Sequence, residues 1–253
     1  MKIALLSLSG GLDSTSLLLH ILMKKEYDKI YTYSFKYGQN HSIELDLAQR
    51  NADLFNKLLK QPIVHHQTID LSSIFADCGS SLTSGSSNIP KGQDYNEGNQ
   101  QSTVIPIRNV IFASILYSKA SGLINTFLKE SNDISVDIFT GVHSNDHTVY
   151  PDCRPQSVQM AQQLFKISDY HGDKINYNTP FVDYSKGQVL SSGISAIKQL
   201  GFMDHLDEIY QNTITCYAPN ENGESCGQCA SCKDRLQAFE DNHLKDPIPY
   251  VTI

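Results

Sequence analysis

The chain has 253 residues, of which 40% are hydrophobic and 19% charged, and its formal net charge is -7. These proportions predict an ordinary globular fold, and an acidic balance without a basic face argues against a nucleic-acid partner. No apolar run approaches the roughly 20 residues of a membrane span, and no signal-peptide pattern precedes the first predicted strand. We therefore expect a cytoplasmic protein with a large domain, residues 1–205, and a smaller C-terminal segment, residues 206–253.

Strand and helix patterns alternate along the chain. Apolar runs typical of buried strands lie at residues 3–8, 30–35, 63–69 and 136–140. Helical patterns lie at residues 15–24, 41–59, 110–120, 157–167 and 186–200. This order predicts an α/β fold with a doubly wound, mostly parallel sheet that is covered on both faces.

Two stretches interrupt the alternation. Residues 77–103 are rich in Ser, Gly, Asn and Gln, and a stretch this long is typical of an active-site lid or a disordered loop. Residues 123–137 are predicted to be a shorter surface excursion without chemistry.

The first predicted strand leads into the sequence Ser-Gly-Gly-Leu-Asp-Ser, residues 9–14. Glycines allow close approach of the backbone to a ligand, and the N-terminus of the following helix favours an anion. The alternative is a tight connection without a ligand. The loop lacks the Gly-Lys-Ser/Thr of a P-loop and resembles the SGGxDS loop of the PP-loop ATP pyrophosphatases. That resemblance implies ATP-binding residues at Leu8, Ser9, Gly10, Gly11, Leu12, Asp13, Ser14 and Thr15.

Polar and basic residues follow other predicted elements, at the edge where parallel sheets bind ligands. Phe35 ends the second strand, Gln39 follows it, and both are candidates for contacting the nucleotide. A loop that caps the next helix through Asn40 is an equal alternative. Arg108 and Lys186 lie near helix N-termini, where a cation is unfavourable unless an anion is shared. Surface side chains with ordinary partners are the alternative for both.

The densest polar cluster follows the fourth predicted strand. Asp146 and Asp152 could hold Mg²⁺ or accept hydrogen bonds from a base edge, and Arg154 could bind a carboxylate or phosphate through two hydrogen bonds. The alternative for Arg154 is a pair with Asp152 that only holds the loop. His143 is more typical of a hydrogen-bonded loop histidine, and Cys153 of a small buried side chain.

Four cysteines near the C-terminus have the spacing C-x9-C-x2-C-x2-C. They are Cys216, Cys226, Cys229 and Cys232. Thiolates bind Zn²⁺ tetrahedrally, and a site with four of them is closed and structural. An iron–sulfur cluster is one alternative, and disulfides are the weakest alternative in a reducing compartment. We favour zinc because no redox partner motif accompanies the cluster.

These motifs together resemble the QueC family of queuosine biosynthesis over nearly the whole chain. The matching stretches are residues 9–14, 35–41, 80–83, 106–109, 150–154, 179–186 and 213–232. Few other families combine that first loop with that cysteine cluster. The resemblance implies a homodimeric, ATP-dependent ligase that uses Mg²⁺ and carries structural Zn²⁺.

The implied reaction activates a carboxylate. The carboxylate of 7-carboxy-7-deazaguanine attacks the α-phosphate of ATP and releases pyrophosphate, and ammonia displaces AMP to give an amide. A second adenylation activates the amide oxygen, and loss of AMP leaves the nitrile. The candidate catalytic residues are Asp13, Arg108, Arg154 and Lys186. The candidate substrate-binding residues are Asn109, Asp146, Tyr150, Asp152 and Arg154. We expect the acceptor between the ends of the first and fourth strands, under the loop of residues 77–103, with Arg154 as its main anion ligand.

Four positions depart from the family pattern. Lys36 replaces an aspartate, Ile107 and Val149 replace glycines, and Gln188 replaces an acidic residue. They leave open a paralogue that stops at the amide or uses another amine, or an amidating or thiolating PP-loop enzyme with another substrate. A non-enzymatic nucleotide-binding module is disfavoured by the intact glycine loop and the many charged residues near it.

Overall fold

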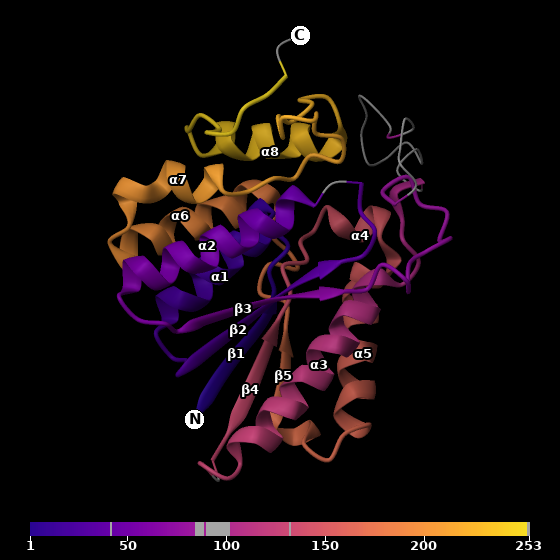
Figure 1. Ribbon diagram of the computed structural model, residues 1–253, viewed down its shortest axis with the longest axis vertical. Helices are drawn as coiled ribbons and strands as arrows, with labels where there is room; N and C mark the ends of the chain where they lie inside the picture. The colour runs from indigo at the N-terminus through magenta and orange to yellow at the C-terminus, as the bar shows by residue number, and fades with distance from the viewer. Residues whose placement is uncertain (41, 84–88, 90–101, 132, 252–253) are drawn as a thin grey trace.

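The computed structural model describes residues 1–40, 42–83, 89, 102–131 and 133–251. Within these ranges, five parallel strands form one sheet in the order β3-β2-β1-β4-β5 (Figure 1). The strands are β1 (Lys2–Ser7), β2 (Lys29–Lys36), β3 (Val64–Asp70), β4 (Ser135–Phe139) and β5 (Ile175–Asn178). β1 is central, since its Leu5 pairs with Tyr31 of β2 on one side and Ile138 of β4 on the other.

Helices cover both faces of the sheet (Figure 1). One face carries α1 (Leu12–Lys24), α2 (Ile43–Leu59), α6 (Lys186–Leu200) and α7 (Leu206–Gln211). The other face carries α3 (Arg108–Phe127) and α5 (Pro155–Ile167). The short α4 (Asp146–Val149) follows β4, and α8 (Ala230–Asp241) packs beside α6. The predicted doubly wound α/β fold is confirmed.

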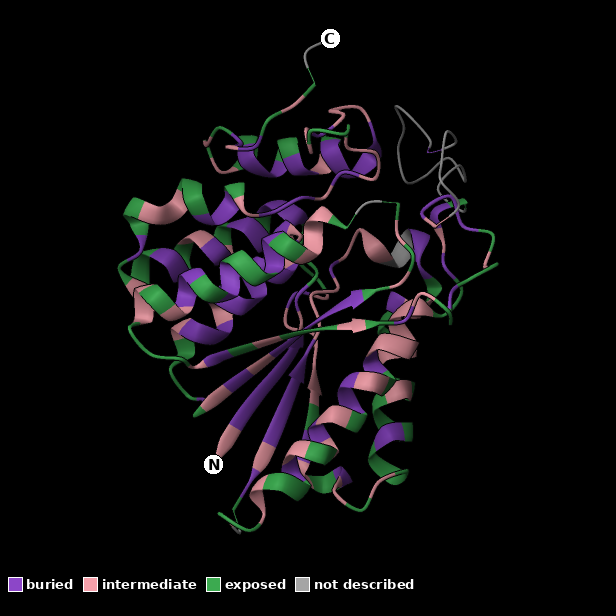
Figure 2. Ribbon diagram, in the orientation of Figure 1, coloured by how far each residue is buried: buried purple, intermediate pink, exposed green. Residues whose placement is uncertain are grey.

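β1 is buried on both faces, as Figure 2 shows in purple. Ala4 and Leu6 pack toward the α1 and α6 side, and Ile3 and Leu5 toward α3. All four side chains are fully buried, which explains why this strand is a continuous apolar run. The chain leaves β1 toward β2 on one side of the sheet and returns through β4 on the other. This reversal opens a crevice beyond the carboxyl ends of β1 and β4.

The structure corrects two predictions about the chain between strands. Residues 123–137 are not a surface excursion, because α3 continues to Phe127, Ile124 is fully buried, and β4 already begins at Ser135. β5 was not predicted, because this strand has only four residues and is only partly apolar. Most of residues 77–103 lie outside the described ranges.

Among the described residues, α3 alone has the length and apolar composition of a membrane span. In this fold it packs on the sheet through Leu116, Ala120 and Ile124. Only 28% of its apolar window is buried. The expectation that no apolar run approaches the length of a membrane span is therefore wrong for this helix.

A buried ion pair ties the C-terminal segment to the core. The fully buried Arg235 donates from Nε to Oδ2 of Asp246 at 2.7 Å, and from a terminal nitrogen to Thr213 Oγ1 at 2.8 Å. Tyr210 lies in the same core as α1, where its hydroxyl is 3.0 Å from Ser16 Oγ. The boundary at residue 205 stays a prediction, because the residues after it share this core.

Candidate active site

A cavity of about 290 Å³ lies beyond the carboxyl ends of β1 and β4, close to the lower size limit of small-molecule sites. Segments that follow β1, β2 and β4 line it together with the N-terminus of α3 and residues 214–217. Most of the predicted site residues meet there: Ser9, Gly11, Asp13, Ser14, Phe35, Gln39, Arg108, Asn109, Asp146, Tyr150, Asp152 and Lys186. The remaining loop residues Leu8, Gly10, Leu12 and Thr15 are buried and do not line the cavity.

The glycine loop is held in shape by its own hydrogen bonds and by α2. The backbone N–H of Ser9 donates to Ser14 Oγ at 3.1 Å, and Gly11 N–H donates to Ser9 Oγ at 3.3 Å. Gly10 has a φ of 79°, and a Cβ there would overlap the backbone oxygen of Glu44. Only glycine fits this position. Gly11 precedes the first residue of α1, so the loop presents a helix N-terminus to the cavity.

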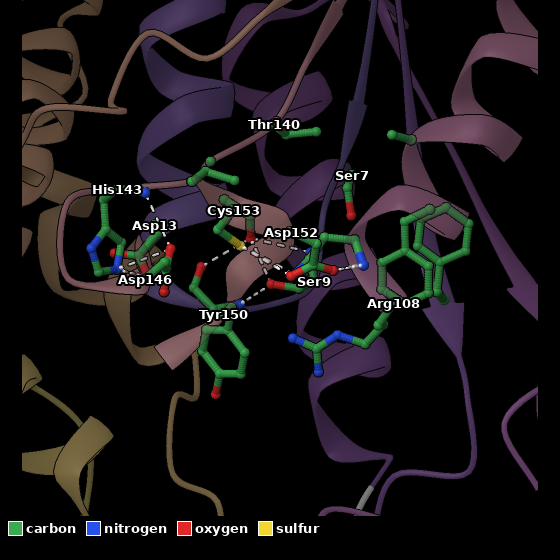
Figure 3. A pocket seen from close by; sticks show the side chains of 18 of the residues that line it. Ser7, Ser9, Asp13, Arg108, Thr140, His143, Asp146, Tyr150, Asp152 and Cys153 are labelled. Carbon is green, nitrogen blue, oxygen red and sulfur yellow. Dashed lines mark hydrogen bonds and ion pairs between the residues drawn. The ribbon is translucent and has the colours of Figure 1, made fainter. Parts of the chain in front are cut away.

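A charged cluster occupies the end of the cavity nearest α1 and α6 (Figure 3). Lys186 Nζ lies 3.1 Å from Asp13 Oδ2, and His143 Nε2 lies 3.7 Å from both Asp13 Oδ2 and Asp146 Oδ2. Burial by itself would raise the pKa of Asp13, but Lys186 and His143 outweigh burial and lower it. Burial disfavours the charged form of Lys186, and Asp13 more than compensates, so the pKa of Lys186 is raised.

One oxygen of Asp13 is free for a ligand. Asp13 Oδ1 is buried and has no hydrogen-bond partner among the described residues. A buried carboxylate oxygen without a partner is unfavourable unless a donor or a cation satisfies it. Mg²⁺ prefers carboxylate oxygens, so Asp13 and the nearby Asp146 fit a magnesium ion.

Arg108 occupies the other end of the cavity among aromatic rings (Figure 3). Its guanidinium carbon lies 5.3 Å from the ring centre of Tyr37, 5.8 Å from that of Tyr150 and 6.0 Å from that of Phe112. Within the described residues it has no ion pair, and its buried Nε has no hydrogen-bond partner. Burial opposes its charge, but Tyr37 and Tyr150 raise the pKa of Arg108 overall. Burial raises the pKa of Glu44, and Arg108 lowers it electrostatically, so this carboxyl group is near Arg108 without forming an ion pair. A buried cation without a direct ion-pair partner fits an anionic ligand.

Glu44 is a cavity residue that the sequence did not single out. Gln39 donates from Nε2 to Glu44 Oε1 at 2.8 Å, while Gln39 Oε1 accepts the backbone N–H of Tyr37 at 2.7 Å. Burial raises the pKa of Glu44 to about 7. In the sequence, Glu44 reads as an ordinary acidic residue in the first turn of a helix, which gives no signal of a site.

Asp152 and Cys153 support the start of α3. Asp152 Oδ2 accepts the backbone N–H of Asn109 at 2.8 Å, and Asp152 Oδ1 accepts Asn109 Nδ2 at 3.1 Å. Cys153 is buried, and burial raises the pKa of its thiol well above the usual range. This environment agrees with the prediction of a buried, unreactive side chain. Asn40 does not cap α2, because Ser42 holds that position.

Arg154 lies outside the cavity lining. It precedes the first residue of α5, and its side chain is exposed. Its assignment as the main anion ligand stays a prediction.

The four departures from the family pattern also lie outside the cavity lining. Lys36 pairs with Asp70 at 3.1 Å on the surface. Ile107 has a φ of 48°, which explains the glycine usual there. Val149 packs with Tyr150, and Gln188 completes a capping box with Ser185 at the start of α6, a role that glutamate also fills.

The four cysteine sulfurs of the C-terminal cluster lie within 4.8 Å of one another. Backbone N–H groups of Ala218 and Cys226 donate to Cys216 Sγ at 3.3 and 3.2 Å, and Cys229 N–H donates to Cys226 Sγ at 3.4 Å. Such donors stabilise thiolates. The cluster therefore fits a metal ion with four sulfur ligands.

Comparison with known proteins gives full-length matches. A profile of the family described as "Queuosine biosynthesis protein QueC" matches residues 3–243. A relative from Rickettsia conorii, named 7-cyano-7-deazaguanine synthase, is 36% identical over 255 residues and covers 99% of both chains. The 7-cyano-7-deazaguanine synthase 1 of Colwellia psychrerythraea is 35% identical over 245 residues, 96% of this chain and 95% of that one.

Similarity to solved structures is weaker. A predicted subunit of tRNA methyltransferase from Methanocaldococcus jannaschii aligns with 77% of this chain and 75% of its own. Its TM-score of 0.41 and identity of 17% support no statement about function.

Proposed function

The chain belongs to the QueC family, and from this membership we propose that it converts 7-carboxy-7-deazaguanine and ammonia to 7-cyano-7-deazaguanine with ATP. The observation that carries the proposal is the place of the four departures from the family pattern. None of them lines the cavity, so none of these four side chains would touch the substrates. This favours the complete reaction over a paralogue that stops at the amide.

The two ends of the cavity suit the two substrates. The glycine loop and the N-terminus of α1 bind the phosphates of ATP, and Lys186 offsets their charge. Asp13 Oδ1 and Asp146 would hold Mg²⁺, which would supply further positive charge against the phosphates. Arg108 binds the carboxylate of the acceptor and orients it toward the α-phosphate. The aromatic rings around Arg108 provide flat apolar surface for the deazaguanine.

We also propose that the cysteine cluster binds Zn²⁺ and that the protein is a cytoplasmic homodimer. A cluster of four cysteine sulfurs in this geometry suits zinc without an open coordination position. Elemental analysis should find one zinc per chain, and iron with visible absorbance would contradict the assignment. Light scattering after size exclusion should give twice the mass of the 28.2 kDa chain.

The activity is tested by incubating the protein with 7-carboxy-7-deazaguanine, ATP, Mg²⁺ and ammonia. Mass spectrometry should detect the nitrile, with pyrophosphate release that depends on the acceptor. Accumulation of the amide alone supports the paralogue. Pyrophosphate release with no change in the deazaguanine would reject the proposed acceptor.

A further inference from the structure

The cysteine cluster adjoins the cavity rather than standing apart from it. Cys216 is a cluster residue and also lines the cavity, as do its neighbours Ile214, Thr215 and Tyr217. We call residues 214–217 the wall segment. A metal ion at the cluster would therefore hold one end of a cavity wall.

The wall segment is bonded to both sides of the cavity. The backbone N–H of Ile214 donates to the carbonyl oxygen of Gly10 at 2.9 Å, which joins the wall to the glycine loop. The hydroxyl of Tyr217 lies 3.4 Å from that of Tyr150, beside Arg108. A displacement of the wall segment would therefore move the glycine loop and Tyr150 as well.

The wall segment is anchored differently at its two ends. On the N-terminal side, Thr213 Oγ1 accepts a hydrogen bond from the buried Arg235 at 2.8 Å. On the C-terminal side is Cys216, whose sulfur accepts the N–H groups of Ala218 and Cys226 within the cluster. Without a metal, the four sulfurs would be free to separate, and the anchor at Cys216 would be weakened while the anchor at Thr213 remains.

We infer that the wall segment positions the glycine loop and Tyr150, and that the metal-loaded cysteine cluster holds this wall in place. Ile214 and Tyr217 are positioning residues, because they act through Gly10 and Tyr150. The cluster then serves substrate binding as well as the stability of the C-terminal segment. The inference rests on the proposed use of ATP.

The test compares metal-loaded protein with protein stripped of metal by a chelator under reducing conditions. Hydrogen exchange should rise in peptides that cover residues 9–15 and 213–217, while β1 and β4 stay protected. Calorimetry with ATP and Mg²⁺, without acceptor, should show affinity weakened about 10-fold, comparable to losing one or two ordering hydrogen bonds. Unchanged exchange and affinity would overturn the inference, and so would equal loss of protection in β1 and β4.

Two substitutions distinguish the effect of losing the metal from the effect of losing any thiol. Cys226→Ser removes a cluster sulfur and should reproduce the stripped state. Cys78→Ser changes a half-buried thiol outside the cluster and should leave metal content and ATP affinity unchanged; a loss of affinity there equal to that of Cys226→Ser would contradict the inference.

A third variant tests the wall segment in protein that keeps its metal. Tyr217→Phe removes the hydroxyl beside Tyr150 and should raise the KM for the acceptor about 3-fold, with metal content and melting temperature retained. An unchanged KM would overturn the role of Tyr217. If metal-loaded wild-type protein binds no ATP, the proposed function fails; if loaded and stripped protein bind ATP equally, only this inference fails.

Discussion

The two ends of the cavity differ in how their charged side chains are paired. At the glycine-loop end, Lys186 and Asp13 are 3.1 Å apart, and His143 lies between two carboxylates. At the aromatic end, Arg108 has rings around it and no ion pair among the described residues. Removing one partner of an ion pair inside the protein destabilises the fold, whereas a cation without a direct ion-pair partner is available to a ligand. Substitutions at the two ends should therefore separate stability from activity.

The largest effect is expected from a change of shape at the paired end. Gly11→Val places a branched side chain on the cavity lining, where even its Cβ would lie 3.3 Å from Ser9 Oγ. It should reduce turnover below detection while the far-ultraviolet circular dichroism stays native. Gly10→Ala is the contrast, since its Cβ would overlap the backbone of Glu44 and should lower folding stability. Wild-type turnover in Gly11→Val would remove the loop from the mechanism.

Breaking the ion pair at the same end should lower both folding stability and turnover. Lys186→Met leaves Asp13 half-buried without its nearest cation, which should lower the free energy of unfolding by about 3 kcal/mol. Turnover should fall about 10³-fold, because charge on the phosphates is no longer offset. Denaturant unfolding and steady-state kinetics on one preparation measure both. The double variant with Asp13→Asn should recover stability but not turnover, and recovery of turnover would contradict the catalytic assignment.

At the aromatic end, loss of the cation should affect activity alone. Arg108→Met should lower kcat/KM for the acceptor about 10²-fold, with a melting temperature that is unchanged or higher, because an unpaired cation is replaced by an apolar side chain. Arg154→Ala is the matched control, since Arg154 is exposed and outside the cavity lining. A larger loss of turnover in Arg154→Ala than in Arg108→Met would reverse the assignment of the anion ligand.

A pH series sharpens the comparison at the paired end. The pKa of Asp13 is lowered in the folded protein, so its contribution to stability is present above its unfolded pKa and is lost as pH falls through the lowered value. The difference in melting temperature between wild type and Lys186→Met should shrink as the pH falls and Asp13, left without Lys186, becomes protonated. A difference that stays constant down to pH 3 would show that the pair does not determine stability.

The smallest effect is expected at Ile107, immediately before Arg108. A β-branched residue at a φ of 48° is strained, while glycine adds entropy to the unfolded chain. Ile107→Gly should therefore raise the free energy of unfolding by about 0.5–1 kcal/mol net, and the melting temperature by about 2 °C. Calorimetry measures the shift, and kcat should remain within about 2-fold. A lower melting temperature would mean that the exposed side chain makes a stabilising contact.

The sequence by itself determined the features in which local pattern and chemistry coincide. Alternating apolar runs and helical patterns predicted four strands and the doubly wound sheet, because burial on both faces requires continuous apolar strands. The glycine loop and the cysteine spacing were identified because each motif places its functional groups within a few residues. Lys186 and Arg108 were found because a cation at a helix N-terminus is unfavourable without an anion.

The tertiary structure alone decided which of these residues meet. Asp13 and Lys186 are 173 residues apart in the chain, and nothing local to either residue specifies their contact. The same holds for the wall segment, whose link to Gly10 places the cysteine cluster at the cavity. The sequence also did not reveal that Glu44 lines the cavity or that Arg154 is exposed. The direction of a side chain depends on the packing of its helix against the sheet. Local patterns determine elements, whereas contacts between distant residues are determined by how the elements pack.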